Sequence, residues 1–399
     1  MKRSFKKLVV LATSTVLLAG CSLFSSEEDV VTMAELPIFE ATYQPQIAWT
    51  RGIGSGVDKY YSQLQPTADE EAVYVASREG EVKAFEAKTG KLLWSNDFSD
   101  HESNDLNRSA RFSGGIHLAL DTLYIGTENA QVLAIDKDTG ELRWLVKVSG
   151  EVIASPTYST NLVVVHTSRG DLIALDSETG EQKWVLNNKQ PNLTLRGSAT
   201  PSISQGGIVY GRADGFVSAA FLETGKPLWQ IPVARPYGAT ELDRIVDADM
   251  KPVIHNGIIY VLAYNGNLVA IDLLKGQQLW ERNYSGFSDI ALSGSTLYLS
   301  DYRGYLYAVD RNNGDEIWSN KQLAYRNVTG VSVANQYIVV GDGEGYLHWV
   351  DRDTGQFVAQ QELDSDGLYM QPFEARQYLY LQTRSGDLIA IEKPSINKK

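Results

Sequence analysis

The sequence predicts an all-β protein: an eight-bladed β-propeller of four-stranded antiparallel blades, with the ring closed by the N-terminal strand. Along the chain, two glycines ten residues apart recur, and a tryptophan usually follows four residues after the second. Successive copies are 38–51 residues apart, a period typical of propeller blades. Apolar residues near the glycines alternate with the period of strands. The pairs are Gly80/Gly90, Gly170/Gly180, Gly215/Gly225, Gly266/Gly276, Gly304/Gly314 and Gly345/Gly355, with Ala130/Gly140 as a variant, and the tryptophans are Trp94, Trp144, Trp184, Trp229, Trp280 and Trp318, with Ala359 in the last place.

One unit, residues 123–144, illustrates how each blade is expected to form. Its first stretch alternates apolar with small or polar residues, and a tight hairpin leads into the strand Q-V-L-A-I-D. In the following D-x-x-T-G turn, Asp136 can accept main-chain N–H groups and Gly140 can adopt a positive φ. The segment E-L-R-W starts an outer strand, and one strand upstream of Leu123 completes four. Because each sheet has two apolar faces, the blades must stack radially, and we expect the tryptophans to wedge between them.

The two ends of the chain supply the eighth blade. Residues 378–392 begin another unit with turn glycine Gly386, but Pro394 follows and the outer strand is missing. Residues 46–52, Q-I-A-W-T-R-G, resemble an outer strand with Trp49 in the tryptophan position. We therefore expect the N-terminal strand to complete the last blade and to remove the exposed edges of an open ring. In blade seven, Trp349 stands where other blades have alanine, and we expect it to fill the volume left by Ala359.

The N-terminus has the pattern of a secretion signal. Four basic residues within the first seven precede an apolar run from Leu8 to Ala19, which is short for a transmembrane helix. The run ends in Leu18-Ala19-Gly20-Cys21, which resembles the bacterial lipoprotein lipobox. That resemblance implies cleavage before Cys21, its lipidation, and, with Ser22 rather than aspartate next, the periplasmic face of the outer membrane. We therefore expect a signal peptide at 1–20, a lipidated cysteine with a polar tether at 21–44, a propeller at 45–393 and a tail at 394–399.

Composition and motifs exclude several classes of function. The formal net charge is −13 and there is no basic run beyond the signal, so nucleic-acid binding is not expected. Cys21 is the only cysteine, which excludes disulfides and cysteine-based metal or haem sites. The five histidines are isolated in the sequence, and we expect them at the surface or in hairpins. Asp247 and Asp249 lack the glycine and distal glutamate of a calcium loop. We expect no catalytic residue, no cofactor and no metal.

Two family resemblances follow from these motifs. The A-x-D-x-x-T-G-x-x-x-W repeat, as in Ala134–Trp144 and Ala174–Trp184, resembles that of pyrroloquinoline-quinone enzymes, but the adjacent cysteine pair of their dehydrogenases is missing. The lipobox, acidic tether and eight minimal blades together resemble the BamB family, lipoproteins of the outer-membrane β-barrel assembly complex. This resemblance implies a non-enzymatic scaffold that binds the periplasmic POTRA domains of BamA, acts with other subunits of the complex and assists insertion of barrel proteins, with nascent barrel proteins as further partners. Its contact positions correspond to Leu193, Leu195, Arg196, Asp247 and Asp249.

The residues themselves indicate the same region. Variation in repeat length places long excursions at 95–122, 185–207 and 230–257, and binding residues on rigid scaffolds are usually found in such loops. Arg196 could pair with Asp247 or Asp249 inside the protein, or with a carboxylate of the partner. We expect the five contact residues to lie together on one rim. The alternative functions are a periplasmic pyrroloquinoline-quinone-dependent dehydrogenase and a periplasmic sensor or polysaccharide-binding propeller.

Overall fold

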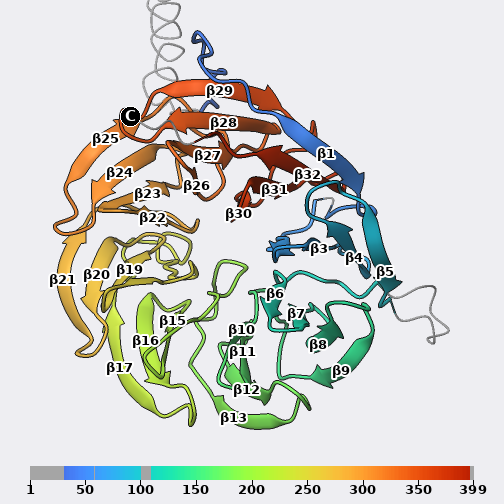
Figure 1. Ribbon diagram of the computed structural model, residues 1–399. Helices are drawn as coiled ribbons and strands as arrows, with labels where there is room; N and C mark the ends of the chain where they lie inside the picture. The colour runs from blue at the N-terminus through green and yellow to red at the C-terminus, as the bar shows by residue number, and fades with distance from the viewer. Residues whose placement is uncertain (1–30, 58, 100–108, 396–399) are drawn as a thin grey trace, which may run out of the picture. The chain divides into compact units, whose positions relative to one another are not determined.

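The computed structural model describes residues 31–57, 59–99 and 109–395, and the described residues from 34 onwards form one compact unit. Within the described residues, 32 strands form eight four-stranded antiparallel sheets, which stand radially around a central axis (Figure 1). The predicted eight-bladed β-propeller is therefore confirmed. Cys21 and the signal peptide lie outside the described residues, so their assignments and the predicted domain boundaries stay predictions.

Each of the first seven blades uses four consecutive strands, ordered from the axis outwards. Blade one has β2 (Thr67–Ala68), β3 (Ala72–Ala76), β4 (Glu81–Glu86) and β5 (Leu92–Asp97). Blade two has β6 (His117–Ala119), β7 (Thr122–Gly126), β8 (Gln131–Asp136) and β9 (Leu142–Lys147). Blade three has β10 (Thr157–Ser159), β11 (Leu162–His166), β12 (Leu172–Asp176) and β13 (Gln182–Leu186). Blade four has β14 (Ser202–Ser204), β15 (Gly207–Gly211), β16 (Phe216–Phe221) and β17 (Pro227–Pro232).

The remaining blades repeat this order until the last one, which takes its outer strand from the other end of the chain. Blade five has β18 (Val253–His255), β19 (Ile258–Leu262), β20 (Leu268–Asp272) and β21 (Gln277–Arg282). Blade six has β22 (Ala291–Ser293), β23 (Thr296–Ser300), β24 (Leu306–Asp310) and β25 (Glu316–Asn320). Blade seven has β26 (Ser332–Ala334), β27 (Tyr337–Gly341), β28 (Tyr346–Asp351) and β29 (Phe357–Glu362). Blade eight has β30 (Phe373–Ala375), β31 (Tyr378–Gln382), β32 (Asp387–Glu392) and β1 (Ile47–Gly52).

Ring closure follows the predicted pattern. Strand β1 pairs antiparallel with β32, and Trp49 lies opposite Ala390. The side chain of Trp49 is 6% exposed and packs beside Phe85 of the next blade. The N-terminal strand therefore joins blade eight to blade one, as predicted.

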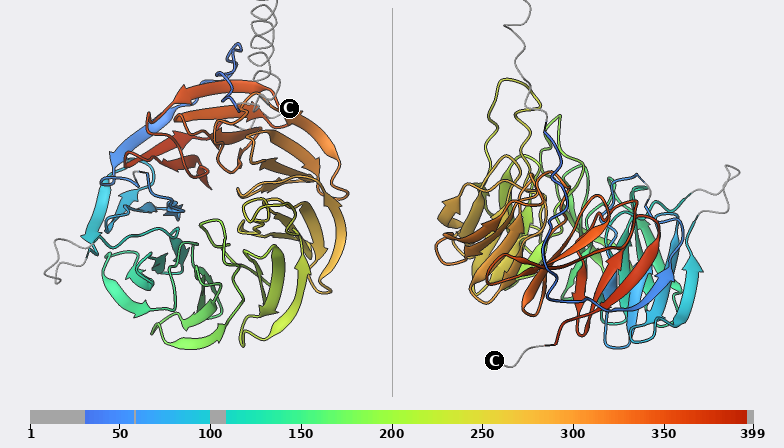
Figure 2. Two further views of the ribbon diagram at one scale, coloured as in Figure 1. Left: turned by 180° about the vertical axis from the view of Figure 1, so that it is seen from behind. Right: turned by 90° about the horizontal axis from the view of Figure 1, so that it is seen from above.

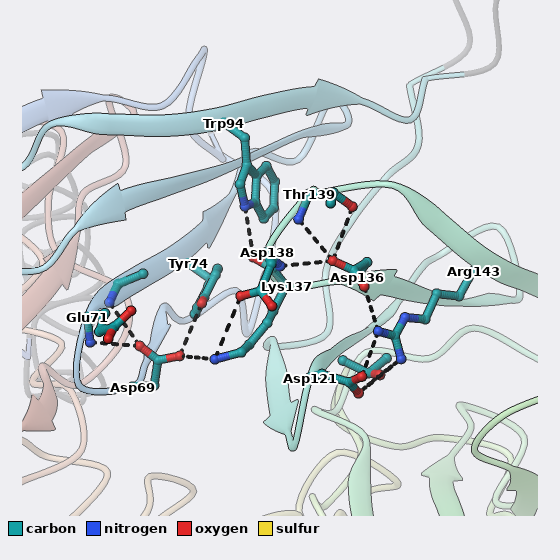
Figure 3. A network of polar contacts seen from close by, with 12 residues as sticks. Asp69, Glu71, Tyr74, Trp94, Asp121, Asp136, Lys137, Asp138, Thr139 and Arg143 are labelled. Carbon is teal, nitrogen blue, oxygen red and sulfur yellow. Dashed lines mark hydrogen bonds and ion pairs between the residues drawn. The ribbon is translucent and has the colours of Figure 1, made fainter.

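The outer tryptophans fasten neighbouring blades to one another. Each indole Nε1–H donates to a main-chain carbonyl in the turn of the next blade, and the ring covers the second turn glycine of that blade. In Figure 3, Trp94 donates to Lys137 in this way, while Arg143 bridges Asp121 and Asp136 and the Lys137 ammonium reaches Asp69 of blade one. The pairs are Trp49–Ala87 (3.1 Å), Trp94–Lys137 (2.8 Å), Trp144–Ser177 (2.9 Å), Trp184–Leu222 (2.9 Å), Trp229–Leu273 (3.0 Å), Trp280–Arg311 (3.1 Å) and Trp318–Arg352 (2.9 Å).

The junction between blades seven and eight is built differently. Ala359 holds the tryptophan position there, and Trp349 lies opposite it in the β28–β29 pair and is fully buried, which confirms the prediction for Trp349. Residues 34–46, here called the strap, run along the outside of the ring beside β29 (Figure 1). The N–H groups of Thr42 and Tyr43 donate to the Val358 carbonyl, and the Tyr43 ring lies 5.0 Å from that of Trp349. The strap thus covers the junction that lacks an outer tryptophan.

Candidate partner-binding face

Two long loops leave the ring on the same face. Because successive strands of a blade alternate in direction, the links from an outer strand to the next blade emerge at the same end as the hairpins between second and third strands. We call this end the loop face. Residues 187–201 join blades three and four there, and residues 233–252 join blades four and five. Both loops, green to yellow in Figure 2 (right), project from the ring.

Three of the five predicted contact residues lie in the first of these loops. Leu193 is 44% exposed, Leu195 is half-buried and the Arg196 side chain is 49% exposed. Two neighbouring apolar side chains and a guanidinium therefore reach the surface within four residues. The centre of a protein interface is more apolar than the rest of the surface, and arginine is enriched at interfaces.

Arg196 pairs with carboxylates that the sequence analysis did not consider. Its Nη2 lies 3.2 Å from Oε2 of Glu128 and 3.8 Å from Oε2 of Glu151. The suggested internal pairing with Asp247 or Asp249 is not found among the described residues and is corrected here. The physical reason is that the guanidinium faces blades two and three, whereas both aspartates belong to the loop beyond blade four.

Asp247 and Asp249 lie inside the second loop. Asp247 is 1% exposed, and its main chain exchanges hydrogen bonds of 2.8 and 3.3 Å with Tyr264 in the hairpin of blade five. Asp249 meets the first loop: a Cβ placed on Gly197 would lie 2.8 Å from its Oδ2. The two loops therefore touch, as expected; Asp247 is buried, Asp249 is half-buried and Leu193 is exposed.

The two carboxyl groups are unusual acids. Burial, followed by the adjacent Asp249 carboxyl, raises the pKa of Asp247 to about 9, and burial raises the pKa of Asp249 to about 6. Within the described part of the chain, neither side-chain oxygen of Asp247 has a hydrogen-bond partner. Both shifts favour the protonated carboxyl groups, so near neutral pH this pair should carry less negative charge than two exposed aspartates would.

A central cavity of about 870 Å³ opens beside these loops and is lined by inner strands and loops of most blades. Asp249, Asp289, Tyr61, Phe287 and Tyr369 are part of its wall. Among the described residues, no group of three or more histidine, cysteine, aspartate or glutamate side chains is placed to hold a metal ion. The side chains that line the cavity are thus both aromatic and polar.

The histidines do not all follow the expectation of surface positions. His166 is 2% exposed and its Nδ1 lies 3.2 Å from the Ala199 carbonyl, while His348 is fully buried with Nε2 2.9 Å from Oδ2 of Asp342. Burial lowers the pKa of His166 to about 4. Both belong to strands that are buried on both faces in the ring of blades, a tertiary effect that isolated positions in the sequence do not reveal.

The described residues contain no helix whose length and apolar character would let it span a membrane.

The fold and this face define a class: an eight-bladed propeller built on quinone-enzyme-type repeats, with two long touching loops on one face. A family model described as outer membrane protein assembly factor BamB matches residues 44–108 and 78–320. BamB of Yersinia pestis is 43% identical over 97% of this chain and 99% of its own length, and BamB of Vibrio cholerae is 44% identical over 97% and 98%. The chain belongs to the BamB family of outer-membrane protein assembly factors.

Solved structures agree with the fold. BamB of Moraxella catarrhalis superposes with a TM-score of 0.78 at 24% identity, covering 88% of this chain and all of the other. A quinohemoprotein alcohol dehydrogenase of Comamonas testosteroni superposes with a TM-score of 0.69 at 14% identity, covering 89% and 78%. The second likeness concerns the fold alone. The protein is an assembly factor rather than an enzyme, and its quinone-type repeats are structural.

Proposed function

We propose that this protein is a lipid-anchored scaffold of the outer-membrane barrel-assembly complex that binds the periplasmic POTRA domains of BamA through its loop face and so assists insertion of barrel proteins. The observation that carries the proposal is the contact between the two long loops. They place Leu193, Leu195 and Arg196 in one loop, and Gly197 of that loop lies against Asp249, with Asp247 buried nearby in the second loop. The leucines would be apolar anchors, Arg196 would orient the contact, and the aspartates would support the loop from below.

The test is binding of purified BamA POTRA domains to the soluble protein lacking its first 21 residues. Leu193→Asp should weaken binding about tenfold or more, because it places a charge at the centre of an apolar contact. Leu274→Asp is the matched control: Leu274 is 76% exposed in the β20–β21 turn, which lies at the opposite end of the blade. Equal binding by the wild type and the Leu193→Asp protein would place the interface elsewhere.

The anchor is tested separately. Cys21→Ser should prevent processing at the lipobox and remove lipid from the protein, which intact-mass measurement of the membrane fraction can detect. An unmodified cysteine in the mature wild-type protein would contradict the lipoprotein assignment and leave the POTRA test unaffected.

A further inference from the structure

Glu128 lies at the tip of the hairpin between β7 and β8, on the loop face. Its side chain is 7% exposed, and its main-chain N–H donates to the Arg111 carbonyl at 3.0 Å. The same carboxylate oxygen, Oε2, accepts a hydrogen bond from Arg78 Nη2 at 2.8 Å and forms an ion pair with Arg196 Nη2 at 3.2 Å. One enclosed carboxylate of blade two thus joins the hairpin of blade one to the loop that precedes blade four.

Arg78 fixes the position of that carboxylate. Arg78 is 6% exposed, and its guanidinium lies 3.9 Å from the centre of the Tyr60 ring. A guanidinium held between an aromatic face and a carboxylate has little rotational freedom. Because two hairpin tips of a rigid propeller carry Arg78 and Glu128, the pair forms a fixed point for a third residue.

The first loop needs such a fixed point. Within the described part of the chain, the main chain of residues 191–197 makes no hydrogen bond, so the backbone does not define the loop's shape. Ser198 beyond it is buried and donates through Oγ to the His166 carbonyl at 3.4 Å. Between Pro191 and Ser198, the ion pairs of Arg196 are the polar contacts that tie the segment to the ring.

The two carboxylates near Arg196 differ in their surroundings. Glu151 is 43% exposed and 3.8 Å away, so water and salt screen its attraction. Glu128 is nearer and enclosed, and water screens its attraction much less. The contact with Glu128 should therefore dominate the orientation of Arg196.

We propose that Glu128 is a positioning residue for partner binding: through Arg196 it holds Leu193 and Leu195 in the binding conformation without touching the partner itself. This inference rests on the proposed function, since it assigns a cause to the shape of the proposed contact loop. It also changes the role of Arg196, whose guanidinium mainly acts inside the protein.

The test is a double-mutant cycle with POTRA-domain binding as the readout. Glu128→Gln should weaken binding about as much as Arg196→Ala, and the combined variant should be no weaker than either single variant, because both remove the same link. Glu151→Gln, the matched loss of the other carboxylate, should change binding less than about twofold. Losses that multiply in the double variant, or normal binding by Glu128→Gln, would overturn the proposal.

A second measurement separates this proposal from the proposed function and from simple unfolding. Backbone NMR order parameters of the free protein should fall at residues 192–197 in Glu128→Gln and stay unchanged in the strands of blades five to eight. Because Glu128→Gln leaves Arg78 buried without its partner, the variant Arg78→Met/Glu128→Gln is prepared as well and should show the same local change. Unchanged order parameters in this loop would overturn the proposal whether or not POTRA domains bind.

Discussion

Gly180 excludes a side chain for two separate reasons. Its φ is +72°, a region that residues with a Cβ avoid, and a Cβ there would lie 2.7 Å from Val146 Cγ1 and 2.9 Å from the Trp144 ring. Gly206 has a similar φ of +76°, but a Cβ added to it would meet no heavy atom of the described residues within 4 Å. Alanine substitutions at these two positions therefore separate the cost of a positive φ from the cost of a steric clash between blades.

Gly180→Ala should lower the free energy of unfolding more than Gly206→Ala does. Gly206→Ala should cost about 1–2 kcal/mol for the backbone alone. Gly180→Ala should cost a further ~1–3 kcal/mol because Trp144 and Val146 must move. Urea unfolding of both variants gives the comparison, and equal losses would mean that the tryptophan contact adjusts freely.

The buried aspartates make stability depend on pH. Since the folded pKa of Asp247 is about 9 and the ordinary value is 3.8, the folded protein keeps a proton that the unfolded chain releases. The stabilising contribution is complete below pH ~4 and is lost as pH rises through about 9. Asp249, with a pKa of about 6, acts in the same direction over a narrower range.

Asp247→Asn should therefore flatten this dependence. The amide is neutral at every pH, so the variant should gain stability relative to the wild type as pH rises from 5 to 9. Thermal or urea unfolding of both proteins at pH 5, 7 and 9 measures the difference between them. A difference that stays constant across this range would show that Asp247 titrates normally in the folded protein.

At the scale of elements, the strap covers the junction between blades seven and eight, which lacks an outer tryptophan. Seven junctions carry an outer tryptophan that donates to the next blade, whereas blades seven and eight rely on Trp349, Ala359 and the strap. Tyr43 lies 5.0 Å from the rings of both Trp349 and Tyr337. Aromatic contacts from outside the blades thus replace a contact within the repeat.

Tyr43→Ala should loosen this junction and lower the melting temperature by several degrees. The loss of the aromatic packing should also quicken amide exchange in β29 more than in β13, which is remote from the strap. Ile38→Ala is the matched control, because Ile38 belongs to the same segment and is 99% exposed. A melting temperature equal to that of the control would mean that the strap lies on the blade without fastening it.

The blades could be predicted from sequence because their determinants are local and repeat. Gly140, Asp136 and Trp144 recur at fixed spacing, so their turns, caps and contacts could be assigned by analogy between copies. The strap could not, because residues 34–44 follow no repeat and were expected to belong to a tether, yet Thr42 and Tyr43 bond to blade seven. Their partners are more than 300 residues away in the chain, and only the closed ring brings them together.

The candidate site was predicted only in outline. The loops, the exposure of Leu193 and the proximity of Asp249 to the first loop agree with expectations. The burial of Asp247 and the contact of Arg196 with Glu128 do not follow from the sequence. Glu128 stands in an ordinary blade hairpin two residues before Ala130, and pairing between loops of different blades depends on the ring's curvature.

At the scale of the whole molecule, a closed ring has no free sheet edge between its first and last blades, and β1 is the piece that closes it. Trp49 fills the interface between blades eight and one, where it contacts Phe85 and Tyr380. It donates to the Ala87 carbonyl at 3.1 Å and covers Gly90. Without β1, strand β32 would become an exposed edge, and blade one would lose the neighbour that covers its apolar face.

Trp49→Ala should therefore cost about 3–5 kcal/mol of unfolding free energy, the usual loss for a large buried aromatic side chain.

Deleting residues 31–52 should destabilise the ring further and also cause association, because it exposes the unpaired edge of β32 to other chains. The truncated protein should therefore form oligomers whose size increases with protein concentration. Deleting only residues 31–43 removes most of the strap but keeps β1, and this protein should stay monomeric. Urea unfolding and light scattering after size-exclusion chromatography measure both effects. A stable, monomeric protein without residues 31–52 would contradict closure by the N-terminal strand.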